Sequence, residues 1–196
     1  MAIADRHERE RAARRRLIVT TARSLAEDEG WDAVTTRRLA TEIEYSQPVL
    51  YKHFTGMDQI ADAVAIDGFE ELADALRAAG SDAGPAHAAL VQIAHAYLQF
   101  ARDHPAVYEA MFTRSTSLHF GAEDTPRQLE AAFSVLRDAV GKVAGQQDFD
   151  TLTEVFWAAL HGLVILDRTG RLRPGHESAR VHLLVGQFAE QREPLP

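Results

Sequence analysis

The chain has 196 residues, of which 46% are hydrophobic and 26% charged, and its formal net charge is −8. This length and composition are typical of a folded chain with a sizeable core. The absence of cysteine excludes disulfides and cysteine-ligated metal sites. The longest apolar run, VFWAALHGLVIL, is too short to span a bilayer, and no apolar segment of signal-peptide length follows the arginine-rich N-terminus. We therefore expect no membrane insertion or export, and a cytoplasmic location.

The charge is distributed unevenly along the chain. Residues 1–56 hold 10 Lys and Arg against 9 Asp and Glu, whereas residues 57–196 hold 11 against 20. The segment RHERERAARRR, residues 6–16, carries six arginines against two glutamates. A basic front end and an acidic body are expected where one end of a protein meets a polyanion. A solvated, frayed terminus would have the same charge, so charge alone leaves both alternatives open.

Almost every segment has a helical period, and no β-branched run alternates with polar residues over the length of a strand, so we predict an all-α fold of about nine helices. The first predicted helix covers residues 10–29, and Gly30 ends it. Thr35 is the predicted N-cap of a short second helix, and Pro48 fits the first turn of a short third one. The predicted helices after the first cover residues 36–43, 46–54, 57–79, 85–102, 104–114, 126–144, 149–167 and 177–190.

The second and third predicted helices have the length and spacing of a helix-turn-helix, whose second helix lies in the DNA major groove. Leu50 and Phe54 are the large apolar pair of this second helix at i, i+4 spacing, and we expect them to pack inward. The step of about 100° per residue then turns the other side of the helix toward solvent.

The side chains on this outward side are suited to DNA. Glutamine can hydrogen-bond a base edge, proline and valine can contact a thymine methyl, and tyrosine, lysine and histidine can reach phosphates. Arg37 and Arg38, at the start of the preceding helix, are expected to point toward the same surface. The outward set comprises Gln47, Pro48, Tyr51 and Lys52, flanked by Val49 and His53.

The segment TTRRLATEIEYSQPVLYKHFTGMDQIADAV, residues 35–64, resembles the TetR family of transcriptional regulators, including the Leu-Tyr-x-His-Phe ending of the third predicted helix. The resemblance extends over residues 12–64. The resemblance implies a homodimer whose N-terminal domains occupy successive major grooves of a double-stranded DNA operator. It also implies a DNA-binding domain with a basic arm at residues 1–56 and an effector-binding and dimerisation domain at residues 57–196. The family positions that often touch DNA correspond to Thr35 or Thr36, Gln47, Tyr51, Lys52 and His53.

A second resemblance lies in the C-terminal body. VFWAALHGLVIL is similar to the Trp-His-Gly motif, here Trp157, His161 and Gly162, that names one C-terminal subclass of the family, and HPAVYEAMF at residues 104–112 is similar to a segment of the same subclass. We expect aromatic side chains to line an apolar effector pocket, although each could instead be core packing and the histidine a hydrogen-bonded core residue. The candidates are Phe69, Tyr97, Phe100, Tyr108, Phe112, Phe133, Trp157 and His161.

Two positions depart from the family pattern. Family turns usually have a glycine where this chain has Glu44, at a position expected to require positive φ, which is strained for a residue with a Cβ. A lysine common at the start of the fourth helix is replaced by Met57, although the helix N-terminus still offers amides to a phosphate. Both departures bear on the affinity for DNA.

The sequence contains no Ser-His-Asp spacing, phosphate-binding glycine loop or HExxH motif, and we predict no catalytic residue, cofactor or metal. Apolar stripes on the last two helices are expected, by the family resemblance, to pair across a two-fold axis. We therefore predict a homodimeric, ligand-responsive repressor that a partly apolar small molecule releases from a pseudo-palindromic operator. The alternative, suggested by Glu44, Met57 and the negative total charge, is a helical small-molecule binding protein with weakened or lost DNA binding.

Overall fold

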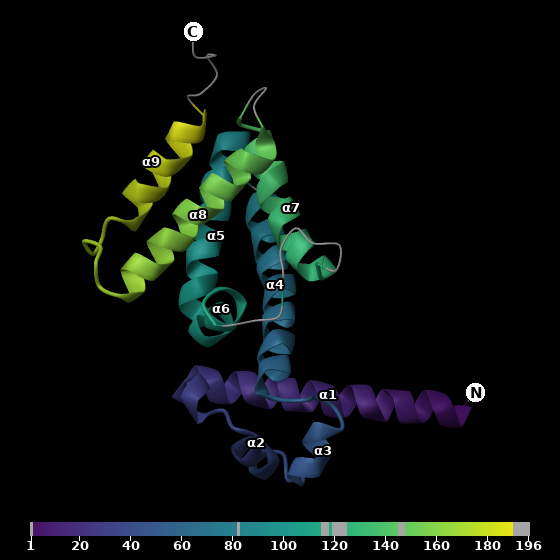
Figure 1. The fold of residues 1–196 in the computed structure, drawn as a ribbon. Helices are drawn as coiled ribbons and strands as arrows, with labels where there is room; N and C mark the ends of the chain where they lie inside the picture. Colours follow the sequence, from purple (N-terminus) through teal and green to yellow (C-terminus); the bar gives the residue numbers. More distant parts are fainter. Residues whose placement is uncertain (1, 82, 115–117, 119–124, 145–147, 190–196) are drawn as a thin grey trace. The chain divides into compact units, whose positions relative to one another are not determined.

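The computed structural model describes residues 2–81, 83–114, 118, 125–144 and 148–189, and within these ranges it contains helices and no strand. The predicted all-α fold is therefore confirmed (Figure 1). A short 3-10 helix, η1, covers Trp31–Ala33. The α-helices are α1 Ala2–Glu29, α2 Thr36–Glu42, α3 Gln47–Tyr51, α4 Met57–Ser81, α5 Ala86–Asp103, α6 Pro105–Phe112, α7 Arg127–Gly141, α8 Phe149–Arg168 and α9 Glu177–Ala189.

The helices pack into two compact units. The first comprises residues 1–68 and 104–124 and the second residues 69–103 and 125–196. The first unit thus combines α1, α2, α3 and the start of α4 with α6, which comes much later in the chain. The predicted division into residues 1–56 and 57–196 assigns functions rather than packing, and it stays a prediction.

Helix α1 begins at Ala2 rather than at the predicted residue 10. The prediction followed apolar periodicity, which begins only in the second half of this helix. The missed turns contain no Gly or Pro and are rich in arginine, glutamate and alanine, which favour helix. Arg6 pairs with Glu10 at 3.7 Å between Nε and Oε1, at i, i+4 spacing, and Arg9 donates to the backbone carbonyl of Asp5 at 3.2 Å. Such local pairs stabilise a charged helix without a core.

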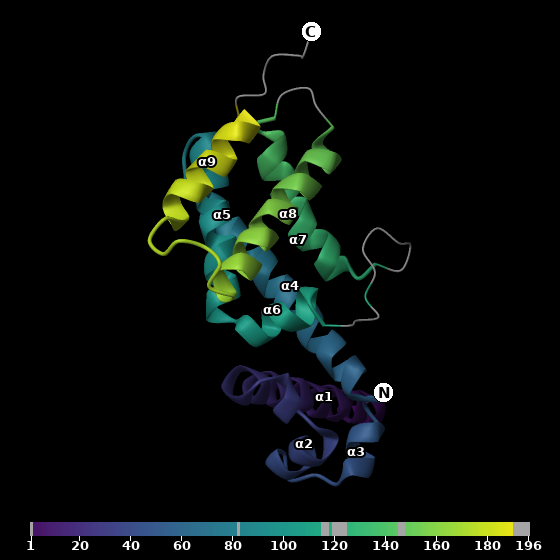
Figure 2. The same ribbon diagram turned by 60° about the vertical axis from the view of Figure 1, so that its left-hand side comes forward.

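A small apolar core joins α1, α2 and α3, which lie together in both views of the ribbon (Figures 1 and 2). Leu50 and Phe54 are 1% and 2% exposed, and Ile18 and Leu39 are completely buried. The predicted inward packing of the i, i+4 pair is therefore confirmed. Each such side chain stabilises the fold by roughly 1.5–3 kcal/mol relative to exposure, which anchors a helix too short to be stable alone.

Helix α6 packs on α1 within the first unit. Trp31 Nε1 donates to the carbonyl of Ala106 at 2.8 Å, and the carboxylate of Glu27 accepts the backbone N–H groups of Ala106 and Val107 at 3.0 and 3.1 Å. A carboxylate at this position satisfies free amides and complements the helix dipole. Gly68 of α4 approaches α6 so closely that a Cβ there would lie 2.4 Å from Val107 Cγ1.

The second unit is built around α5, which packs against α7, α8 and α9. The Phe156 and Phe188 rings meet edge to face at 5.2 Å between centroids. Other apolar side chains face outward from α8 and α9, since Val155, Leu166 and Leu183 are 54%, 40% and 67% exposed. By length and composition alone α8 could cross a membrane, although the core helix of a soluble protein can meet the same criteria. These side chains leave an apolar surface that a protein partner could cover.

Candidate DNA-binding surface

Hydrogen bonds cap both ends of α2, and those at its C-terminal end form the turn to α3. Thr35 is the N-cap, as predicted, and its Oγ1 accepts the N–H of Arg38 at 3.1 Å. At the other end Glu44 has φ 56° and the N–H of Tyr45 donates to the carbonyl of Ala40 at 2.9 Å. This is a Schellman motif, whose left-handed residue is usually glycine. The positive φ expected at Glu44 is confirmed.

Helix α3 ends at Tyr51, although the predicted helix extends to residue 54. The N–H groups of Lys52 and His53 bond to carbonyls three residues back, at 3.2 and 2.9 Å, so the chain tightens into a 3-10-type turn. Ser46 occupies the N-cap position without a side-chain capping hydrogen bond. The turn leaves Lys52 and His53 at the C-terminal edge of the short helix, beside α1.

The residues predicted to face DNA lie on the surface of the first unit. Tyr51 is 53% exposed, which is unusual for an aromatic side chain and leaves most of its ring open to a ligand. The side chains of Val49, His53 and Thr36 are half-buried at the flanks. The remaining predicted contacts, Thr35, Arg37, Gln47, Pro48 and Lys52, are exposed.

Arg38 is exposed like Arg37, but its guanidinium is paired within the protein. Its Nη2 lies 2.9 Å from Glu29 Oε1 and its Nε 2.8 Å from Glu42 Oε1. The hydrogen bond to Glu42, together with the charge of Glu29, raises the pKa of the guanidinium. From the sequence we expected Arg38 to point toward the same surface as Arg37. In the structure Arg38 instead links α2 to the end of α1.

A basic hollow of about 350 Å³ lies beside the end of α3. Arg15 Nη1 donates to the carbonyl of His53 at 3.2 Å, which fixes the end of α3 against α1. Burial lowers the pKa of His53, and so do the positive charges around it. The lining consists of His7, Glu10, Arg11 and Arg14 from α1 and Lys52 and His53 from the end of α3.

Sequence reasoning recognised the basic arm but did not single out Arg11 and Arg14 as site residues. A signal was present, because His7, Arg11 and Arg14 are spaced i, i+4, i+7 and therefore share one face of a helix. This spacing places the three side chains on one face only if the chain is already helical at residue 7. The predicted helix began at residue 10, so the shared face was not recognised. Correcting the start of α1 therefore also extends the candidate surface.

The predicted effector residues are divided between the units. Tyr108 and Phe112 belong to the first unit and the other six to the second. Within the second unit Trp157 Nε1 donates to the hydroxyl oxygen of Tyr97 at 3.0 Å. Burial lowers the pKa of His161. Of the eight candidates Phe69, Tyr97, Phe100 and Tyr108 are buried, whereas Phe112, Phe133, Trp157 and His161 are half-buried.

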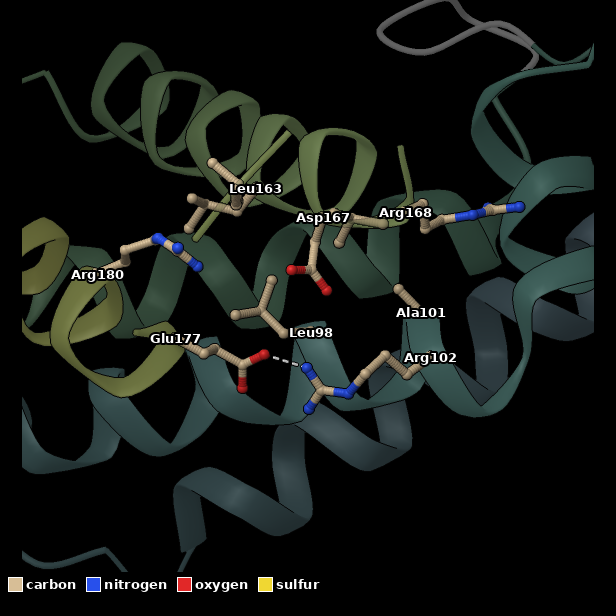
Figure 3. A pocket seen from close by; sticks show the side chains of 10 residues that line it. Leu98, Ala101, Arg102, Leu163, Asp167, Arg168, Glu177 and Arg180 are labelled. Atoms are coloured by element: carbon tan, nitrogen blue, oxygen red, sulfur yellow. Dashed lines mark hydrogen bonds and ion pairs between the residues drawn. The ribbon is translucent and has the colours of Figure 1, made fainter. Parts of the chain in front are cut away.

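A cavity of about 30 Å³ between α5, α8 and the start of α9 is lined by none of the eight candidates (Figure 3). Arg102 and Glu177 form an ion pair at its edge, and Asp167 and Arg180 extend toward the same space (Figure 3). Its volume is about that of one water molecule. It is therefore too small, in this shape, to hold an effector.

The first unit combines a capped short helix, a left-handed turn and a second short helix with an exposed polar side, all seated on α1. This arrangement defines a helix-turn-helix DNA-binding protein. Residues 18–64 match the family model of bacterial regulatory proteins of the tetR family, and residues 90–188 match the tetracyclin repressor-like C-terminal domain. The chain belongs to the TetR family of transcriptional regulators.

Relatives agree with this assignment. The uncharacterised HTH-type transcriptional regulator Rv0681 of Mycobacterium tuberculosis is 33% identical over 161 residues, which cover 80% of this chain and 71% of that protein. A solved structure of a protein with unknown function from Rhodococcus sp. RHA1 has a TM-score of 0.71 and 28% identity, covering 89% of this chain and 93% of that one.

The structure of RolR in complex with resorcinol has the same fold, with a TM-score of 0.65 and 16% identity, and covers 96% of this chain and 97% of that one. At this identity the likeness concerns the fold alone. The more specific assignment to the Trp-His-Gly subclass is not confirmed by these matches and stays a prediction.

Proposed function

We propose that the protein is a ligand-responsive repressor that binds a pseudo-palindromic operator as a homodimer and is released by a small-molecule effector. The DNA-binding part of this proposal rests on the difference between the two sides of α3. Leu50 is buried beneath the helix, whereas Gln47, Tyr51 and Lys52 are exposed on its other side. A short helix that is anchored from one side and polar on the other suits insertion into a major groove.

Each exposed side chain has a chemical role in this proposal. Gln47 reads a base edge, where a bidentate contact discriminates by about 1–3 kcal/mol, and Pro48 contacts a thymine methyl. Tyr51 and Lys52 bind phosphates, with His53 beside them. The cap residues Thr35 and Thr36 and the exposed Arg37 complete the proposed DNA surface at the start of α2.

The proposed homodimer is supported by the apolar surface of α8 and α9. Val155, Leu166 and Leu183 are exposed, and a second copy related by a two-fold axis would bury the same residues on both chains. A four-helix interface of this kind needs no membrane, which is consistent with a cytoplasmic protein. In the proposed complex the two α3 helices of the homodimer occupy half-sites about 34 Å apart.

The proposed effector site is the aromatic group of the C-terminal body. The hydrogen bond from Trp157 to Tyr97 places polar atoms among apolar rings, a combination that suits a partly apolar ligand. RolR, which shares the fold, was solved with resorcinol, and this makes small phenols a reasonable first class to screen. An effector would favour a conformation in which the two α3 helices no longer match adjacent grooves.

The proposal can be tested by selecting DNA from the host genome. Purified dimer is incubated with genomic fragments at about 0.1 M salt, bound fragments are sequenced, and affinity for the enriched sequence is measured against salt. We expect a pseudo-palindromic sequence and a linear fall of log K with log salt concentration. A folded dimer that enriches no sequence, or binds DNA without salt dependence, would contradict the proposal and favour the helical small-molecule binding protein.

A further inference from the structure

Residues 5–17 of α1 form a charged helical segment that contributes no buried side chain to the core. Every residue from 5 to 17 is exposed, and the segment carries the six arginines of the basic arm. Burial of apolar side chains therefore does not explain this segment. Its surface charge is the property that it contributes.

Part of this charge is neutralised locally, and part is not. Glu10 lies 3.7 Å from Arg6 Nε and 3.8 Å from His7 Nδ1, so the acid of the basic hollow is paired with residues one turn toward the N-terminus. Within the described residues Arg11 and Arg14 have no ion-pair partner. Their charges are left for a ligand.

The position of the arm relative to α3 is fixed by Arg15. This residue donates to the carbonyl of His53 at 3.2 Å, and its guanidinium carbon lies 4.1 Å from the centre of the buried Phe54 ring. Arg11, one turn before Arg15, and Arg14, directly before it, share the basic hollow with Lys52 at the end of α3. Three cations from two helices converge on a space of about 350 Å³.

We infer that Arg11, Arg14 and Lys52 form a binding site for a backbone phosphate of the DNA that flanks the bases contacted by α3. The inference rests on the proposed DNA-binding function and extends it along α1. Guanidinium groups match phosphate oxygens with paired N–H donors, and the hollow is continuous with the proposed DNA surface through Lys52. The contact is independent of base sequence, so it contributes affinity and salt dependence rather than base recognition.

His53 makes this site sensitive to protons. It is half-buried among Arg11, Arg14, Arg15 and Lys52, and burial together with these charges lowers its pKa; His7 and Glu10 line the same hollow. A bound phosphate adds negative charge beside the imidazole and favours its protonated form. DNA binding should therefore take up a proton, and affinity should rise as pH falls from about 7.5 to about 6.

The test compares two double variants that remove the same charge from α1. R11Q/R14Q changes the hollow, whereas the control R9Q/R16Q removes two exposed arginines of α1 that do not line it. Each phosphate contact adds about 0.9 to the slope of log K against log salt concentration. We expect R11Q/R14Q to reduce this slope by up to about 0.9 per protomer and to weaken operator and non-operator duplexes alike by about tenfold. The control should retain the wild-type slope.

Equal losses in the two double variants would overturn the inference, because the effect would then belong to the total charge of the arm. An unchanged slope in R11Q/R14Q would also overturn it. Circular dichroism and thermal unfolding verify that each variant is folded. As a second readout, His53→Gln should abolish the rise in affinity at low pH, whereas His87→Gln, which changes an exposed histidine of the second unit, should retain it. A rise that persists in His53→Gln would contradict the uptake of a proton at this site. If the wild type itself binds no duplex, the proposed function fails rather than this inference.

Discussion

The turn between α2 and α3 places Glu44 at φ 56°, a conformation that glycine adopts readily and a residue with a Cβ does not. Its neighbours require this geometry, because the N–H of Glu44 donates to the carbonyl of Thr41 at 3.2 Å and the N–H of Tyr45 to that of Ala40 at 2.9 Å. Replacing Glu44 by glycine should therefore stabilise the protein without altering the turn.

The expected gain is the difference between two opposing effects. The left-handed conformation costs a residue with a Cβ about 1–2 kcal/mol, whereas glycine loses about 0.5–1 kcal/mol more backbone entropy on folding than alanine. The net stabilisation is about 0.5–1 kcal/mol. For a chain of this size it corresponds to a rise in Tm of about 1–4 °C.

The assay is thermal unfolding of the wild type, E44G and E44A, followed by circular dichroism. Alanine removes the carboxylate but keeps the Cβ, so it separates the charge from the backbone conformation. Only E44G should gain stability, while both variants should bind duplex DNA more tightly because an exposed negative charge beside α3 has been lost. Equal stabilisation by alanine and glycine would refute the argument from φ, and a lower Tm for E44G would refute the turn itself.

Three further changes test other parts of the structure. Gly68→Ala should lower stability by about 1–3 kcal/mol, because its Cβ would meet Val107 Cγ1 at 2.4 Å; an unchanged Tm would contradict this close packing. Trp31→Phe should cost about 1–2 kcal/mol by removing the donor to the Ala106 carbonyl, as measured by urea unfolding. Because burial lowers the pKa of His161, the unfolded chain takes up its proton first, so stability should fall as pH drops below about 6.5. His161→Gln should weaken this decline in Tm scans between pH 7.5 and 5, and an unchanged decline would exclude His161 as a source of it.

Much of the N-terminal fold could be predicted from the sequence because its signals are local. The cap at Thr35 depends on neighbouring residues, and the packing of Leu50 and Phe54 follows from helical spacing. The positive φ at Glu44, in contrast, was expected from the family resemblance. The early start of α1 was missed because that segment lacks apolar periodicity and is stabilised by charged pairs instead. Apolar periodicity therefore does not detect a helical segment that is stabilised by charged side chains.

The remaining features depend on contacts between distant parts of the chain. Glu27 caps α6 across 79 residues of sequence, and no pattern around either end indicates this pairing. Arg38 pairs with Glu42 at the local i, i+4 spacing, but its second partner, Glu29, comes from the end of another helix. The candidate effector residues were chosen as aromatics, a choice that cannot separate core packing from ligand binding, and these sites stay predictions.

The central claim is that the outward side of α3 binds operator DNA. The most direct measurement is the affinity of the Y51A/K52A variant for the enriched genomic sequence, compared with wild type and with K142A, which removes an exposed lysine from the second unit. We expect Y51A/K52A to bind at least tenfold more weakly with an unchanged Tm, and K142A to bind like the wild type. Unchanged affinity in a folded Y51A/K52A protein would contradict the account.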